Sequence, residues 1–85
     1  MKFRFTAHAL EEMARRGLDR GLVEGVLENP AQVREERRNR EALQSRVNFP
    51  DGEYLLRAIV DRRTDPPAVV TVYRTRYIAK CWRQE

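Results

Sequence analysis

Residues 68–74, Ala-Val-Val-Thr-Val-Tyr-Arg, decide the fold of this 85-residue chain. Four of these seven residues are β-branched and none is Gly or Pro, a composition that predicts a sheet strand covered on at least one face. The two-residue alternation of a strand places Val70 and Val72 on one face, and Val69 and Tyr73 on the other. Because a basic stretch follows this apolar strand, we expect the functional surface at this end of the sheet.

Composition limits the classes of protein to which the chain can belong. Its 17 Lys and Arg residues exceed its 13 Asp and Glu residues, and the net charge of +4 favours an anionic partner, nucleic acid above all. Cys81 is unpaired, which favours a reducing compartment. No apolar run is long enough to span a bilayer and no signal-peptide core follows the charged start, so we expect a cytoplasmic protein with no membrane partner. A chain of this length forms one domain, spanning residues 1–85.

The first third of the chain predicts two short helices. Thr6 is a suitable N-cap for a helix over Ala7–Arg16, which Gly17 can end. Asp19 is a suitable N-cap for a second helix that ends at Asn29, before a proline. Helices this short are unstable alone, so their apolar stripes must pack on a sheet.

The remainder alternates between apolar and polar residues. Residues 32–36 predict a short edge strand, the charge-dense run 36–41 a mobile turn, and residues 43–49 and 54–61 two paired strands. With the strand at 68–74, the sequence predicts an α+β fold in which two N-terminal helices pack on one face of a three- to four-stranded antiparallel meander.

Alternation also predicts a polar surface on the sheet face away from the helices. Arg57 lies in the middle of an apolar strand, where a guanidinium inside the core would have no partner, so its face must be wet or paired. Arg46 and Tyr73 share this face by parity. We expect Arg74, Arg76 and Lys80 to form its rim and to bind RNA.

Several segments resemble a known family: residues 5–9 (Phe-Thr-Ala-His-Ala), 16–17 (Arg-Gly), 55–61 (Leu-Leu-Arg-Ala-Ile-Val-Asp) and 71–75 (Thr-Val-Tyr-Arg-Thr). The chain resembles small bacterial proteins of unknown function placed near the RelE/ParE toxin superfamily, BrnT-like members included. Glu12 stands where an arginine is expected. The resemblance implies a RelE-like fold and the toxin component of a type II toxin–antitoxin system, a metal-free endoribonuclease that cuts ribosome-bound mRNA and is silenced by a cognate antitoxin encoded nearby.

Metal-free RNA cleavage requires groups that move protons and stabilise charge on the phosphate. Arg46 and Arg57 are the candidates for holding the phosphate, because a guanidinium can bind two phosphate oxygens while remaining charged. Tyr73 could stack on a base or relay a proton, and His8 could act as the acid or base. The chain has no His or Cys cluster with metal-ligand spacing and no Gly-rich phosphate loop, so we expect no metal or cofactor.

Each of these residues also has a structural interpretation. Arg57 could pair with Asp61 or with a carboxylate on a neighbouring strand, Tyr73 could be a packing residue, and His8 could be exposed. Two functional alternatives follow. One is a non-catalytic module that uses the basic face to bind RNA or an acidic peptide, and the other is a homodimer whose interface is that face, including Leu55 and Ile59.

Overall fold

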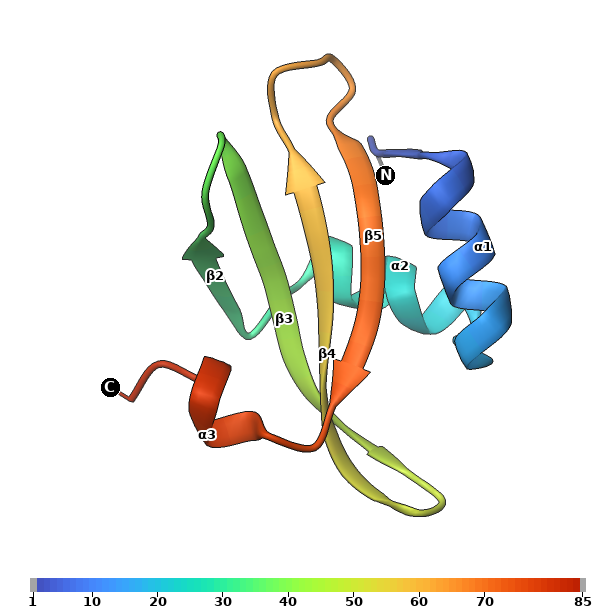
Figure 1. The fold of residues 1–85 in the computed structure, drawn as a ribbon, viewed down its shortest axis with the longest axis vertical. Coiled ribbons are helices and arrows are strands. Elements are labelled where there is room, and N and C mark those ends of the chain that lie inside the picture. Colours follow the sequence, from blue (N-terminus) through green and yellow to red (C-terminus); the bar gives the residue numbers. More distant parts are fainter. Residues whose placement is uncertain (1, 85) are drawn as a thin grey trace.

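The computed structural model describes residues 2–84, which form an α+β fold with a five-stranded mixed sheet and three short helices (Figure 1). The strand order is β1-β5-β4-β3-β2, in which β2 to β5 pair antiparallel and β1 pairs parallel with β5. The elements are β1 (Arg4–Phe5), α1 (Ala7–Arg16), α2 (Arg20–Glu28), β2 (Gln32–Glu35), β3 (Arg40–Phe49), β4 (Gly52–Asp61), β5 (Ala68–Thr75) and α3 (Ile78–Cys81).

The predicted RelE-like arrangement, with two helices on one face of a three- to four-stranded antiparallel meander, is wrong. The sheet gains a fifth strand because β1 pairs parallel with β5, where the Arg4 amide donates to the Pro67 carbonyl at 2.9 Å and the Thr6 amide to the Val69 carbonyl at 3.1 Å. A third helix, α3, follows the last strand. Residues 2–5 alternate between polar residues and phenylalanine, but the stretch is too short to predict a strand, and backbone hydrogen bonds hold the two residues of β1 in the sheet.

The two N-terminal helices begin and end where local chemistry predicts. The Thr6 hydroxyl accepts from the Ala9 amide at 3.1 Å at the start of α1, and the Asp19 carboxylate accepts from the Leu22 amide at 3.1 Å at the start of α2. Gly17 ends α1 with φ at 64°, in the left-handed region that favours glycine. Both predicted N-caps are therefore confirmed.

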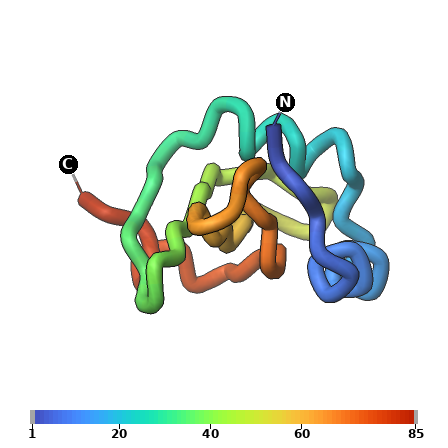
Figure 2. The backbone as a smooth tube through the Cα atoms, turned by 90° about the horizontal axis from the view of Figure 1, so that it is seen from above, coloured from blue at the N-terminus to red at the C-terminus, as the bar shows by residue number. Residues whose placement is uncertain are grey.

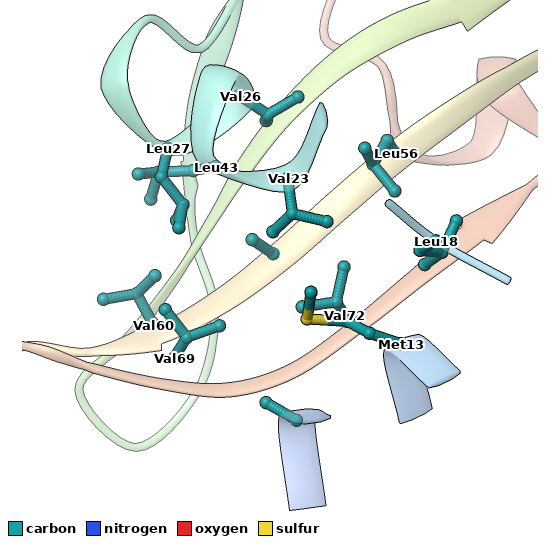
Figure 3. Packing of buried hydrophobic residues seen from close by; sticks show 12 residues of the cluster. Met13, Leu18, Val23, Val26, Leu27, Leu43, Leu56, Val60, Val69 and Val72 are labelled. Atoms are coloured by element: carbon teal, nitrogen blue, oxygen red, sulfur yellow. The ribbon is translucent and has the colours of Figure 1, made fainter. Parts of the chain in front are cut away.

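The hydrophobic core lies between these helices and one face of the sheet, here called the core face, which carries Leu43, Leu56 and Val72 (Figure 3). α1 contacts β5, whereas α2 contacts β3 and β4 (Figure 1). Full burial of one Val or Leu side chain contributes about 1.5–3 kcal/mol, so packing rather than helix propensity holds the two helices in place.

The alternation predicted for β5 is wrong at its start. A β-bulge between Ile59 and Val60 of β4 leaves Val70 without a partner in the register, and Val69 rather than Val70 is fully buried in the core. An extra residue in one strand reverses the faces on one side of the bulge. Beyond the bulge, Val72 and Tyr73 keep their predicted faces.

The C-terminal segment, residues 78–84, lies across the opposite face of the sheet, here called the outer face, which carries Gln44, Arg57 and Tyr73. α2 and this segment lie on opposite sides of the sheet when the molecule is seen from above (Figure 2). No helix in the described part of the chain is long and apolar enough to cross a membrane.

Candidate functional site

A buried polar network occupies the centre of the outer face. Arg57 in β4 is only 6% exposed, and its guanidinium donates to the Gln44 side-chain oxygen at 2.8 Å, to the Tyr73 hydroxyl at 2.6 Å and to the Glu36 carboxylate at 2.9 Å. The prediction that Arg57 and Tyr73 share a face is confirmed by this contact. The carboxylate that pairs with Arg57 is Glu36, beyond the end of β2, rather than Asp61.

Electrostatics keep the Arg57 guanidinium charged. Burial alone would lower its pKa, but the hydrogen bonds to Tyr73 and Glu36 outweigh burial, and the pKa of Arg57 lies above its ordinary value. Because the Arg57 side chain is only 6% exposed and three of its five N–H donors bond to neighbouring side chains, it holds those side chains together and offers little surface to a ligand. Arg57 is therefore not placed to hold a phosphate.

The C-terminal segment closes another part of the outer face. The Gln44 side chain, which is fully buried, donates to Gln32 at 2.9 Å and to the Cys81 carbonyl at 3.2 Å. Arg34 donates to the same Cys81 carbonyl at 2.8 Å. Leu55, expected on an exposed dimer interface, is 0% exposed within the single chain.

Arg46 lies on the outer face as predicted, but in a separate ion pair. Its guanidinium donates to the Glu53 carboxylate at 2.9 and 3.1 Å and lies 5.5 Å from the centre of the Trp82 ring. The hydrogen bonds that Arg46 donates to Glu53 raise the pKa of Arg46. The structure does not join Arg46 to the Arg57 network by any hydrogen bond among residues 2–84.

The predicted basic rim is divided among different surfaces. Arg74 pairs with Leu56 in the sheet register, and its guanidinium stacks 4.1 Å from the Tyr54 ring centre, on the core face rather than the outer face. Arg76 donates to the Tyr54 hydroxyl at 2.8 Å and pairs with Asp51 at 3.1 Å. Lys80 is exposed on α3. The prediction that these residues form one rim around Arg57 is wrong, because Arg74 directly follows Tyr73 in β5 and therefore lies on the opposite face of the sheet.

His8 does not join the candidate site. It is exposed in the first turn of α1, a helix whose buried residues Ala9 and Met13 pack into the core on the face of the sheet opposite Arg57. The interpretation of His8 as an exposed side chain is the one that the structure bears out.

A hollow that the sequence did not reveal lies beside Tyr73. This hollow, here called the arginine pocket, has a volume of about 510 Å³ and is lined by Glu36, Arg37, Arg38, Arg40, Ile59, Thr71 and Tyr73. Its three arginines form no ion pair with any of residues 2–84. The pocket therefore presents an excess of positive charge, three guanidinium groups against the one carboxylate of Glu36, next to a phenol.

The loop that carries these arginines has an unusual backbone. Arg38 and Asn39 both adopt positive φ, at 62° and 64°, and the Glu36 amide donates to the Arg40 carbonyl at 2.7 Å across the turn. Left-handed geometry is uncommon at arginine and costs about 1–2 kcal/mol. The Nε atom of Arg40 is buried without a hydrogen-bond partner in the described part of the chain. The only feature of the sequence that indicated this loop was the charged run 36–41, which we interpreted as a mobile turn. In the structure β3 begins within this run, at Arg40.

A second hollow of about 500 Å³ adjoins the arginine pocket, since Glu36 and Arg40 line both. Two of its three arginines are paired, Arg62 with Glu41 and Arg63 with Asp61 at 2.7 Å. The hydrogen bonds from Arg63 lower the pKa of Asp61 to about 2. No group of three or more His, Cys, Asp or Glu side chains within residues 2–84 could hold a metal ion.

The fold and the two hollows define a small α+β domain with a basic pocket on one edge of its outer face. Residues 5–74 match the family model described as Domain of unknown function (DUF4258), and the chain belongs to this family. The matched region includes every residue that lines the arginine pocket. Neither the curated proteins nor the solved structures gave a significant match. Nothing in these comparisons links the chain to the RelE/ParE superfamily, so that resemblance stays a prediction.

Proposed function

We propose that the protein binds single-stranded RNA through the arginine pocket. The observation that carries the proposal is that three unpaired arginines, Arg37, Arg38 and Arg40, line one hollow together with the Tyr73 phenol. Guanidinium groups bind phosphate oxygens while remaining charged, and an aromatic ring beside them can stack on a base. A volume of about 510 Å³ is that of a small-molecule site and has room for one nucleotide.

The pocket is better suited to a single strand than to a duplex. Sequence-tolerant single-strand sites combine positive charge along the backbone with aromatic stacking of unpaired bases, and both are present beside Tyr73. The hydroxyl groups of Thr71 and Tyr73 offer partners for the ribose 2′-hydroxyl, which distinguishes RNA from DNA. The net charge of +4 supports an anionic ligand.

Fluorescence anisotropy with a labelled uridine hexamer tests the proposal. The double variant Arg37→Ala/Arg38→Ala should weaken binding at least tenfold. The logarithm of the binding constant falls linearly with the logarithm of the salt concentration, and each phosphate contact on a single strand contributes about 0.7 to this slope. Loss of two contacts should therefore reduce the magnitude of the slope by about 1.4. The double variant Arg15→Ala/Arg16→Ala is the matched control, because it also removes two charges, here from arginines paired with Glu12 on α1.

If the two double variants weaken binding equally, net charge rather than the pocket attracts the RNA, and the proposal fails. It also fails if a deoxyuridine hexamer binds as tightly as the RNA at every salt concentration, because the pocket then does not select RNA.

A second candidate function is cleavage of the bound RNA, as the toxin component of a type II toxin–antitoxin system. Tyr73 favours it, because its oxygen accepts from Arg57 at 2.6 Å, which leaves its own O–H to donate to a ligand in the pocket. The ribose 2′-oxygen would attack the phosphorus and lose its proton to water. The 5′-oxygen would leave with the Tyr73 proton, giving a cyclic 2′,3′-phosphate and a 5′-hydroxyl. Its substrate would be ribosome-bound mRNA in the cytoplasm.

Expression in a bacterial host tests the second candidate. Wild-type protein should stop translation, Tyr73→Phe should not, and the product of an adjacent antitoxin gene should restore growth. Tyr73→Phe should still bind the uridine hexamer, because the arginines of the pocket are unchanged. If folded wild-type protein binds RNA but its expression does not harm the host, the result would support RNA binding and contradict RNA cleavage.

A further inference from the structure

Glu36 is the one acidic residue among those that line the arginine pocket, beside three arginines. One of its carboxylate oxygens accepts from Arg57 at 2.9 Å, while the other forms no hydrogen bond within residues 2–84. The side chain is 35% exposed and lines both hollows. One oxygen is therefore fixed to the buried network, and the carboxylate remains accessible to a ligand.

A carboxylate is unfavourable beside the phosphates of RNA unless it contacts a hydrogen-bond donor. An ionised carboxylate only accepts hydrogen bonds, so the group that it contacts on the ligand must donate. Among the parts of a nucleotide, the ribose hydroxyl and the base edge supply such donors, and only the base edge differs from one nucleotide to another. Guanine presents two parallel donors, the N1–H and the 2-amino group, whereas uracil presents one N–H between two carbonyl oxygens that repel a carboxylate.

We propose that Glu36 makes the arginine pocket selective for guanine, an inference that rests on the proposed binding of single-stranded RNA. The guanine edge would meet the Glu36 carboxylate, the base would lie on Ile59 and Tyr73, and the phosphate would contact Arg37 and Arg38. The adjoining hollow, which shares Glu36 and Arg40, provides space for the neighbouring nucleotide. Single-stranded RNA is usually read in this way, through the exposed edges of unstacked bases.

The test compares two labelled RNA hexamers, U6 and U3GU2, by fluorescence anisotropy. Wild-type protein should bind U3GU2 about tenfold to a hundredfold more tightly, the discrimination expected of a two-bond contact to a base. In Glu36→Gln the preference should fall below about threefold, whereas binding of U6 should stay the same or strengthen, because a negative charge next to the phosphates is removed. The glutamine keeps an oxygen that can accept from Arg57, so the buried network retains its third contact.

Glu35→Gln is the matched control, since it removes the same charge one residue earlier, from an exposed side chain that lines only the second hollow. This variant should keep the preference for guanine. Equal binding of U6 and U3GU2 by wild-type protein would overturn the inference even if Glu36→Gln failed to fold, and so would an equal loss of preference in Glu35→Gln. If wild-type protein binds neither hexamer, the proposed function itself has failed.

Discussion

The substitution Arg57→Met should destabilise the fold strongly although it changes a charged residue to an apolar one inside a sheet. Methionine keeps most of the length of the arginine side chain but removes all three hydrogen bonds of the guanidinium. The three partners then differ in access to water. Gln44 is 0% exposed, whereas Glu36 is 35% exposed, and Tyr73 is half-buried.

These exposures set the size of the effect. The Gln44 oxygen has no access to water, so its unmade hydrogen bond should cost about 1–3 kcal/mol. Water can replace the lost partner of Glu36 and of Tyr73, at roughly 0.5 kcal/mol each, the low end for an exchanged hydrogen bond. The free energy of unfolding should therefore fall by about 3 kcal/mol, which corresponds to a loss of roughly 12–24 °C in the melting temperature of a domain of this size.

Thermal and urea denaturation followed by circular dichroism measure this change, and a double-mutant cycle identifies its cause. When Gln44→Leu is combined with Arg57→Met, the Gln44 oxygen is removed as well as the Arg57 group that donates to it. The double variant should therefore lose about 1–2 kcal/mol less free energy of unfolding than the sum of the losses in the two single variants. A melting temperature for Arg57→Met within about 3 °C of wild type, where roughly 4–8 °C corresponds to 1 kcal/mol, would refute the reasoning. Strictly additive effects in the cycle would refute the part assigned to Gln44.

Three further predictions concern the termini of a helix and an acidic side chain. Thr6→Ala should lower the free energy of unfolding by about 1–2 kcal/mol in denaturant titrations, because the Thr6 hydroxyl both caps α1 and donates to the Val70 carbonyl at 3.1 Å, whereas Thr6→Ser should retain most of it. Gly17→Ala should cost about 1 kcal/mol in the same assay, since alanine must adopt the φ of 64° there. Because the pKa of Asp61 is lowered to about 2 from an ordinary value of 3.8, its contribution to stability is complete above pH 4 and is lost as the pH falls from 4 towards 2. Melting temperatures of Asp61→Asn should accordingly lie below those of wild type at pH 6 and converge with them near pH 2; parallel curves over this range would contradict the assignment.

The sequence predicted those parts of the fold that depend on local chemistry. The hydrogen bonds at Thr6 and Asp19 confirm the two predicted N-caps. These caps could be predicted because a short polar side chain just before an apolar helical stripe is typical of the start of a helix. The parallel pairing of β1 with β5, the bulge at Val70 and the position of α3 were missed. These features depend on backbone hydrogen bonds and on contacts between residues distant in sequence, such as Gln44 with the Cys81 carbonyl, which leave no periodic pattern.

The candidate site shows the same division. Alternation identified the face on which Arg57 and Tyr73 lie, because parity depends only on the position along a strand. Parity does not specify a partner, and a buried guanidinium in a sheet is tolerated only when its donors are satisfied. Arg57, one of the two arginines expected to hold phosphate, is therefore bonded to its neighbours and only 6% exposed. Two arginines of the pocket, Arg37 and Arg38, lie in a loop, where no alternation distinguishes a pocket from a solvated turn.

The buried network and the arginine pocket are nevertheless coupled through two side chains. Glu36 and Tyr73 line the pocket, and Arg57 holds both of them by hydrogen bonds. Arg57 is thus a positioning residue for the site, and its loss should release Glu36 as well as lower stability. At a temperature where Arg57→Met remains folded, we expect it to lose the preference for U3GU2 over U6 while keeping the salt dependence set by Arg37 and Arg38. A purely structural role would leave both properties of the folded fraction unchanged, so the two binding measurements separate positioning from stability.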